Sequence, residues 1–400
     1  MLYLTGIILT FFLAVLLLGK KNKVFADRIL VCWLFVIAIH LLLYYLRGKL
    51  IDFPFSFILG LELPLPLLHG PLLYFYTASM TAQLPGHKRR LWLHLMLPAF
   101  SLLLFAPFFL LPAAQKIAVY NNKGAGFEFQ LLLNLIAIFF SGIIYVAVSS
   151  MLLVNHKKNI ANQFSNTERI NLNWLRYLVY GIGLIWVFVF VGKDEWIFGA
   201  VTIFVLLLGF FGIGQVGIFT HKHEPGNFPL EFVETSQQGF IPQDPSKSVN
   251  TLNEIDEANI IKPDISVDQD AAATKRKYLK SGLSEEQASF LHTALTQLMV
   301  DKKLFERSEL TLVELASILS VHPNHLSQVI NEKEGKNFYE YINGLRIEEF
   351  KRLVNLPENK KYTIIGLAYQ CGFNSKSSFN RYFKNVTHLS PSEYIELISE

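Results

Sequence analysis

The hydrophobic pattern divides the chain into an apolar N-terminal part and a polar C-terminal part. Up to about residue 219, long apolar runs alternate with short polar connections. The apolar runs occupy residues 2–18, 29–46, 55–78, 91–111, 129–154, 174–191 and 196–219. Most of them approach the roughly 20 residues that a helix needs to cross a bilayer. The pattern predicts an all-α protein with a bundle of about seven transmembrane helices in residues 1–222.

The composition supports a membrane portion, because 52% of the residues are hydrophobic and 34 are Phe. A cleavable signal peptide is the alternative interpretation of the first apolar run. That run has no basic residue before its apolar core and no small-x-small cleavage pattern after it. We therefore interpret the first run as a membrane span.

The orientation follows from the basic residues of the connections. Lys and Arg concentrate in the first, third and fifth connections. By the positive-inside rule, these connections face the cytoplasm. We expect a multi-pass protein of the bacterial inner membrane, with its N-terminus outside and its C-terminal domain in the cytoplasm.

The composition changes after Phe219. Residues 223–274 are rich in Pro, Ser, Gln and Asp, and acidic side chains outnumber basic ones. Such a segment is typical of a flexible, self-repelling linker. A helical pattern resumes in residues 275–400, where Ser284 and Gln287 form a capping box and an apolar stripe continues to about Val300. This first helix either packs on the domain that follows or serves in dimerisation or signal coupling.

Two helix-turn-helix patterns follow, at residues 311–332 and 363–386. In the first pattern, Thr311 caps one helix and Pro323 begins the next. In the second, Thr363 is the cap and Gly372 permits the sharp turn. We expect the second helix of each pattern to face DNA through polar side chains, namely Asn324, His325, Ser327 and Gln328 in the first copy and Lys376, Ser377, Asn380, Arg381 and Lys384 in the second.

A single helix-turn-helix pattern is a weak indication of DNA binding, whereas two copies at this spacing are a strong one. The residues between them predict one connecting helix, capped by Asn337 and running from Phe338 to Asn355. Its length would be about 27 Å. This approaches the roughly 34 Å of one duplex turn, so both recognition helices could enter successive major grooves.

The second pattern carries a longer motif, A-x-x-x-G-F-x-S-x-S-x-F-x-R-x-F-K, from Ala368 to Lys384, followed by Ser390-Pro391. On these residues, positions 305–396 resemble the tandem helix-turn-helix domain of AraC-type transcription regulators. The resemblance implies sequence-specific binding to double-stranded promoter DNA. The chain departs from the family pattern at His388, where Gly is usual, and at Phe350, where a small residue is usual.

The charge distribution points to the second copy. Residues 359–392 contain basic but no acidic side chains, whereas the first copy has few cations. Since cations supply most of the affinity for the phosphate backbone, we expect weak binding by a monomer and dependence on a homodimer. RNA polymerase is a further candidate partner.

The third apolar run contains the candidate sensing residues. Glu62 is the one acidic residue well inside a run. His69, seven positions later and on the same helical face if the segment stays regular, is its nearest candidate partner. An ionisable residue inside a membrane is a functional candidate by default. Alternatively, Glu62 is solvated near the outer surface and His69 is a hydrogen-bonded core residue. The prolines of this run predict a broken helix. The run also resembles the membrane half of membrane-bound AraC-type regulators, which implies a sensor role without naming the stimulus ligand.

The sequence contains few other candidate sites. The sequence has no phosphate-binding glycine loop, no nucleophile elbow and no HExxH pattern. His221 and His223 lack an evident third ligand, and Cys32 and Cys371 are expected in different compartments. We therefore expect no metal site, no cofactor, no disulfide and no direct catalysis. Two alternatives remain: a transporter or membrane enzyme regulated by its tail, or a tail that binds other proteins.

Overall fold

The computed structural model describes residues 2–21, 23–47, 58–85, 92–168, 170–191, 194–215 and 283–399. Within these ranges the helices are joined by turns and irregular segments, and the one β feature is an isolated bridge, which confirms the all-α prediction. The chain divides into two compact units. Unit 1 comprises Met1–Lys158 and Arg169–Lys222, and unit 2 comprises Asn159–Glu168 and His223–Glu400. The linker predicted at 223–274 lies outside the described residues.

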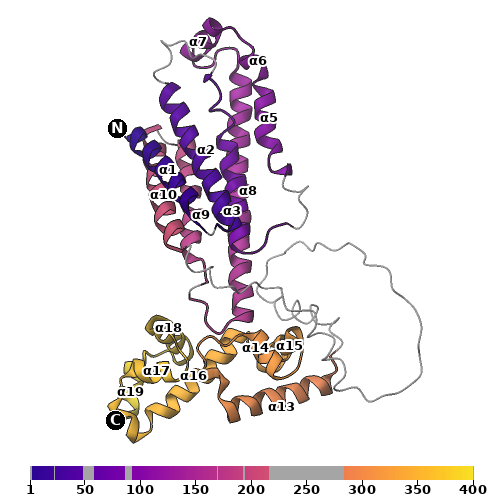
Figure 1. Ribbon diagram of the computed structural model, residues 1–400, viewed down its shortest axis with the longest axis vertical. Helices are drawn as coiled ribbons and strands as arrows, with labels where there is room; N and C mark the ends of the chain where they lie inside the picture. Colours follow the sequence, from indigo (N-terminus) through magenta and orange to yellow (C-terminus); the bar gives the residue numbers. More distant parts are fainter. Residues whose placement is uncertain are drawn as a thin grey trace, which may run out of the picture. The chain divides into compact units, whose positions relative to one another are not determined.

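Unit 1 is a helical bundle in which each of the seven predicted apolar runs contains at least one helix (Figure 1). Its core is formed by Trp33, Leu34, Leu73, Leu175 and Val205, all almost fully buried. The helices are α1 (Leu2–Gly19), α2 (Phe25–Arg47), α3 (Pro66–Met80), α5 (Met96–Leu104), α6 (Ala106–Phe109), α7 (Ala113–Asn121), α8 (Glu128–Gln163), α9 (Asn173–Val191) and α10 (Asp194–Gln215). The last residues of α8 belong to unit 2.

Two of the described helices are long and apolar enough to cross a membrane, at Phe25–Leu46 and Glu128–Gln163. Three shorter apolar helices cover Leu4–Gly19, Asn173–Val189 and Gly199–Phe211. The third run is broken, as its prolines predict, because α3 begins only at Pro66. The fourth run is divided between α5 and α6. The seven-helix transmembrane bundle therefore stays a prediction.

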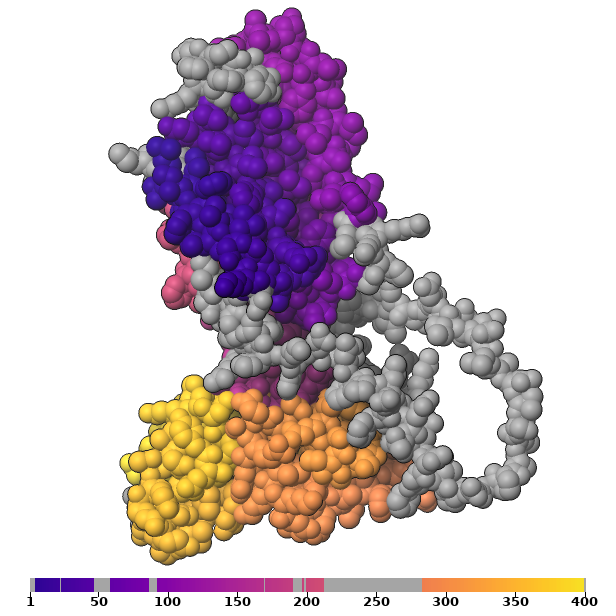
Figure 2. Space-filling view, in the orientation of Figure 1, coloured from indigo at the N-terminus to yellow at the C-terminus, as the bar shows by residue number. Residues whose placement is uncertain are grey.

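Unit 2 contains two helix-turn-helix pairs joined by a central helix (Figure 1). Figure 2 shows α13–α16 and α17–α19 as adjoining orange and yellow parts of its surface. The helical segments are α13 (Glu285–Lys302), η3 (Leu304–Glu306), α14 (Leu312–Ile318), α15 (Pro323–Glu334), α16 (Phe338–Val354), η4 (Pro357–Lys361), α17 (Ile364–Gln370), α18 (Lys376–Thr387) and α19 (Pro391–Ser399).

The predicted caps begin these helices. The Thr311 hydroxyl accepts a hydrogen bond from the Glu314 backbone N–H at 3.2 Å. Asn337 and Glu340 form a reciprocal capping box at the start of α16. Each cap satisfies backbone donors that the first helical turn leaves without a partner. The short polar motifs in the sequence therefore fix where these helices start.

The central helix α16 contributes to two separate apolar cores. Phe338 and Ile342 pack with α13, α14 and α15. Ile347 and Phe350 pack with α17 and α18. Between the two cores lies Arg346, which is only 1% exposed. One continuous helix therefore holds both helix-turn-helix pairs.

Candidate nucleic-acid interface

The first helix-turn-helix pair consists of α14 and α15. Its turn passes through Ser320, which has a φ of 54°, and His322 then caps α15. The His322 Nδ1 accepts a hydrogen bond from the Asn324 backbone N–H at 3.2 Å. The helix buries Leu326, Val329 and Ile330, as its apolar spacing predicts.

The polar side chains of α15 differ in exposure. Asn324 is exposed, and His325 and Ser327 are partly exposed, so all three can be reached from outside. Gln328 was expected to face outward, but it is only 5% exposed. Its Nε2 donates to Glu332 Oε1 at 3.1 Å, and its buried Oε1 has no partner. Because this side chain is covered by its surroundings, Gln328 is removed from the set of candidate DNA contacts.

Helix α13 packs against α15. Ala288 and Leu291 form an apolar cluster with Val329 of α15. Lys333 of α15 pairs with Glu285, and His292 Nε2 lies 2.7 Å from Glu334 Oε1. These contacts agree with the first interpretation of this helix, in which it packs on the domain. They also pair Lys333, the one Lys or Arg residue of α15, with a carboxylate of the same domain.

The second pair, α17 and α18, turns at Gly372. This residue has a φ of +96°, which side chains other than glycine rarely adopt. A Cβ at this position would lie 2.5 Å from the backbone O of Phe305, which belongs to η3. Gly372 therefore permits both the turn and the close approach of the two halves of unit 2.

The recognition helix α18 has one apolar face and one polar face. Phe379, Tyr382 and Phe383 are buried, and Tyr382 Oη donates to the Glu340 carbonyl at 2.7 Å. Ser375 caps the helix by accepting a hydrogen bond from the Ser378 N–H at 3.1 Å. The exposed face carries the side chains predicted to meet DNA, namely Lys376, Ser377, Asn380, Arg381 and Lys384.

The exposed face of α18 is positively charged. The ion pairs that the structure records among the described residues include none with Lys376, Arg381 or Lys384. Residues 359–392 contribute no carboxylate of their own. The three cations are therefore available to an anionic partner such as a phosphate backbone.

The two departures from the family pattern are accommodated locally. His388 has a φ of 61° and ends α18 in the left-handed conformation, with its N–H bonded to the Lys384 carbonyl. His is one of the residues that tolerate this conformation better than most. Phe350 is fully buried, with its ring centroid 4.8 Å from that of Phe379 and 5.6 Å from that of Phe383. The aromatic rings fill the space around α18.

Arg346 connects the two halves through hydrogen bonds. Its Nε donates to the Phe305 carbonyl at 2.7 Å, and its Nη2 donates to the Arg307 carbonyl at 2.8 Å. Burial lowers the pKa of Arg346 to about 10, while nearby Tyr339 and Glu309 act in the opposite direction. The guanidinium therefore stays charged at neutral pH. In the sequence, Arg346 is one of several basic residues in the α16 segment. Its carbonyl partners lie about 40 positions away, so no local motif identifies Arg346 as a buried residue.

Glu349 forms a second polar junction on α16. Its carboxylate accepts hydrogen bonds from Arg352 Nε at 2.9 Å and from Lys303 Nζ at 2.7 Å. The hydrogen bond from Arg352, together with that from Lys303, lowers the pKa of Glu349 to about 2. Glu349 is 8% exposed, so these partners compensate for its loss of contact with water.

The candidate sensing residues of unit 1 do not pair with each other. Glu62 lies in a turn before α3, because Pro66 is the first residue of that helix. Its carboxylate accepts hydrogen bonds from Tyr120 and from the Gly60 N–H. His69 instead contacts His40, with 3.1 Å between their ring nitrogens. The expectation that His69 is the partner of Glu62 is wrong, since the regular helix that it assumed is not formed.

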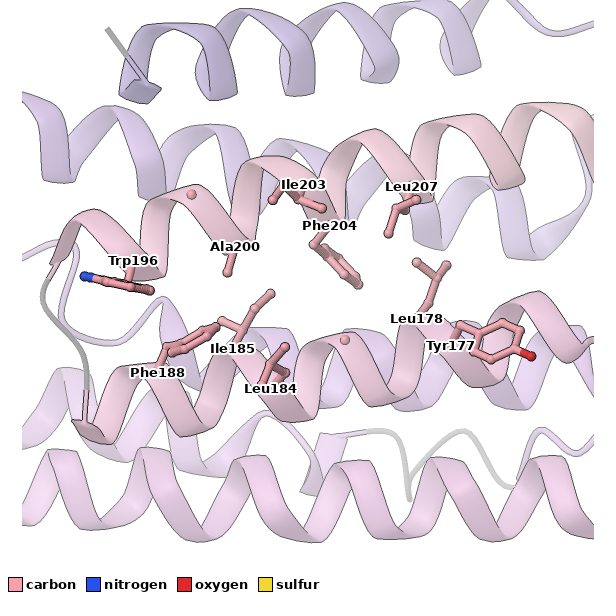
Figure 3. Close-up of a pocket in the computed structure, with 12 residues that line it drawn as sticks. Tyr177, Leu178, Leu184, Ile185, Phe188, Trp196, Ala200, Ile203, Phe204 and Leu207 are labelled. Atoms are coloured by element: carbon pink, nitrogen blue, oxygen red, sulfur yellow. The ribbon is translucent and has the colours of Figure 1, made fainter.

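Unit 1 also has an apolar hollow between α9 and α10, with a volume of about 640 Å³ (Figure 3). Ile185 and Phe188 of α9 lie across it from Ala200 and Phe204 of α10. None of its lining residues carries a charge. Such a hollow offers apolar contact but little orientation to a ligand.

The cysteines form no disulfide and no reactive centre among the described residues. Cys32 and Cys371 are both free thiols. Burial raises the pKa of Cys371 to about 12, so its thiol is a poor nucleophile. No group of three or more His, Cys, Asp or Glu residues capable of holding a metal occurs in the described part of the chain.

Comparisons with known proteins concern the same C-terminal region. Residues 315–396 match a family model described as a helix-turn-helix domain. The uncharacterized HTH-type transcriptional regulator YobQ of Bacillus subtilis (strain 168) is 35% identical over 103 residues, 26% of this chain and 41% of that protein. The uncharacterized HTH-type transcriptional regulator SACOL0084 of Staphylococcus aureus (strain COL) is 35% identical over 92 residues, 23% of this chain and 12% of that protein. No solved structure matches.

The chain spans less than half of the length of either relative. The matches agree with the AraC-type resemblance of residues 305–396. The matched range covers most of the first helix-turn-helix pair, α14 and α15, and all of the second, α17 and α18. Residues 315–396 therefore form a helix-turn-helix domain, similar in sequence to those of HTH-type transcriptional regulators.

Proposed function

We propose that the protein is a membrane-embedded transcription regulator that binds promoter DNA through two helix-turn-helix pairs and responds to a stimulus through its N-terminal helices. The observation that carries this proposal is the exposed face of α18, where Lys376, Arg381 and Lys384 have no carboxylate partner among the described ion pairs. In this arrangement the recognition helix lies in the major groove, with its first residues at the base edges.

The side chains of α18 suit different parts of the duplex. Arg381 and Asn380 can form bidentate hydrogen bonds with guanine and adenine edges, respectively. Lys376 and Lys384 are point charges suited to phosphate. On α15, Asn324, His325 and Ser327 supply polar contacts with little positive charge. We therefore assign most of the affinity to α18, and a homodimer would add affinity by bringing a second α18 to the same DNA.

Membrane embedding is supported by the surface of unit 1. Large apolar side chains are exposed on several of its helices, including Phe12 of α1, Phe129 and Phe140 of α8, and Phe210 of α10. A soluble surface rarely exposes large contiguous apolar areas, whereas a bilayer covers them. We propose the bacterial inner membrane as the location, with the N-terminus outside and unit 2 in the cytoplasm beside the DNA and RNA polymerase.

The polar contacts of Glu62 are our candidate for the sensing site. This carboxylate is 5% exposed and binds the Tyr120 hydroxyl, so a change in its partners would alter the packing before α3. Glu62→Gln keeps the size of the side chain and removes its charge. We expect target-promoter output to be fixed in one state at equal membrane abundance. A normal response of this variant to external pH and growth conditions would reduce Glu62 to a structural role.

DNA binding is tested with the full chain in lipid nanodiscs and a pool of random duplexes. We expect enrichment of specific sequences and a steep loss of affinity with rising salt. Lys376→Ala should lower the slope of log affinity against log salt by about one, because one phosphate contact is lost. Lys302→Ala on α13 is the matched control and should leave the slope unchanged. Equal slopes for the Lys376→Ala variant and the parent would show that Lys376 does not contact a phosphate.

A further inference from the structure

Residues 164–168, between α8 and α9, contact the N-terminus of α18 within unit 2. The Glu168 carboxylate accepts hydrogen bonds from the Ser375 hydroxyl and, at 3.2 Å, from the Ser377 hydroxyl. We propose that this segment, which we call the plug, is an autoinhibitory element that occupies hydrogen-bond donors at the DNA-reading end of α18 and leaves them when DNA binds. This inference rests on the proposed function, since it concerns regulation of the same interface.

The plug is anchored by Ser165, which is 1% exposed. The Ser165 N–H donates to the Leu310 carbonyl at 3.2 Å. The Ser165 carbonyl accepts hydrogen bonds from Asn343 Nδ2 at 3.0 Å and from Arg346 Nη1 at 3.4 Å. Its hydroxyl accepts a further hydrogen bond from Arg346 Nη2 at 3.2 Å. Both the backbone and the side chain of Ser165 therefore form hydrogen bonds with the domain. The plug is held in place more specifically than a loop in surface contact would be.

The flanking residues extend the contact toward the first helix-turn-helix pair. Phe164 forms an antiparallel bridge with Thr311, the cap of α14. Asn166 Nδ2 donates to Glu309 Oε1 at 3.4 Å. The plug therefore reaches from the beginning of α14 to the beginning of α18 and contacts both halves of the domain.

The position of Glu168 conflicts with DNA binding for an electrostatic reason. A helix N-terminus and its hydroxyl donors attract anions, and a phosphate oxygen would use the same donors that Glu168 occupies. The negative charge of Glu168 would also repel the phosphate backbone. Because the first residues of a recognition helix reach the base edges, the plug and a duplex compete for one surface.

Release of the plug leaves the domain intact. Arg346 would keep its hydrogen bonds to the carbonyls of Phe305 and Arg307 and to Asn343 Oδ1, so its buried charge stays partnered. Glu168 itself is partly exposed and can be hydrated on leaving. In sequence, the plug joins α8 to α9, both proposed spans. A stimulus that moves the end of either helix can therefore act directly on the plug.

The first test compares DNA affinity of the full-length parent with that of two plug variants in nanodiscs. Glu168→Ala removes the competing charge, and Ser165→Tyr places a bulky side chain where no space is available. Both should bind the enriched duplex at least about 5-fold more tightly than the parent, since each shifts the plug toward its released state. Glu286→Ala, an equal charge change at an exposed site on α13, is the control and should match the parent.

The second test measures the contact itself, in a Cys32→Ser background. The pair Glu168→Cys and Ser377→Cys should form a disulfide, and the oxidised protein should bind the duplex at least about 10-fold more weakly than the same protein after reduction. Prior addition of the duplex should lower the yield of the disulfide. The pair Glu168→Cys and Ser392→Cys serves as the control and should not cross-link.

The outcomes separate this inference from the proposed function. Equal DNA affinity of the parent, Glu168→Ala and Ser165→Tyr, together with equal affinity of the oxidised and reduced cysteine pair, would overturn the plug while leaving DNA binding in place. Failure of every variant to bind any duplex would overturn the proposed function, and the plug with it.

Discussion

The two helix-turn-helix pairs share a plan but differ in how their recognition helices use charge. In α15, Lys333 pairs with Glu285 and Glu334 pairs with His292, so its charged side chains hold α13 in place. In α18, Arg381 and its neighbouring lysines are exposed. The charged side chains of α15 therefore stabilise the packing of α13, whereas those of α18 give the domain an exposed positive surface. A sequence repeat does not imply that both copies contribute equally to binding.

The largest expected effect comes from the junction on which both pairs depend. Gly372→Ala places a Cβ against the Phe305 carbonyl and requires a left-handed backbone, so it should destabilise unit 2 by roughly 3 kcal/mol. Hydrogen exchange of the α17 and α18 amides in the full chain measures this effect. Gly335→Ala is the control, because Gly335 also has a positive φ of +66° but open space around it, and it should cost about 1 kcal/mol. Equal costs at both positions would contradict the close-approach argument.

The contrast between α18 and α15 is tested by one substitution in each. Arg381→Ala should weaken binding to the enriched duplex by about 1–3 kcal/mol and relax specificity at one base position. Gln328→Ala should weaken binding less than Arg381→Ala does, because the buried Gln328 side chain cannot reach the duplex. Fluorescence anisotropy at several salt concentrations gives both values. A larger loss of DNA affinity for Gln328→Ala than for Arg381→Ala would contradict the proposal that α18 supplies most of the affinity.

A smaller effect concerns the pH dependence of the junction. The folded-state pKa of Glu349 is lowered to about 2, below the roughly 4.3 expected in the unfolded chain. Its contribution is therefore fully present above pH 4.3 and is lost as pH falls toward 2. We expect this contribution to be on the order of 1–2 kcal/mol. In the Glu349→Gln variant, the unfolding free energy should fall less between pH 4 and pH 2 than in the parent. In the Glu348→Gln variant, at an exposed site, it should fall as much as in the parent. Parallel curves for all three proteins would exclude Glu349 as the source.

The local features of the domain could be predicted from the sequence, because they depend on residues only three or four positions apart. The caps at Thr311, Asn337 and Thr363 and the turn at Gly372 are of this kind. The errors arose where distant residues decide the outcome. Gln328 lies on the expected outer face of α15, yet the surrounding structure covers it.

Unit 1 shows the same limit. The prolines correctly predicted a broken third run, but the pairing of Glu62 with His69 assumed a regular helix through that break. Tyr120 and His40, the actual partners, lie far away in the sequence and carried no motif that would have identified them. The plug was missed for the same reason, since Ser165 and Glu168 stand in an ordinary polar connection.

The shared helix α16 has a consequence for how the domain unfolds. Without the second pair, Ile347 and Phe350 would lose their apolar cover, and without the first pair, Phe338 and Ile342 would lose theirs. Opening of either pair would therefore remove part of the packing that holds α16 in place. We therefore expect the two pairs to unfold together, so that a destabilising substitution in one pair also lowers hydrogen-exchange protection in the other.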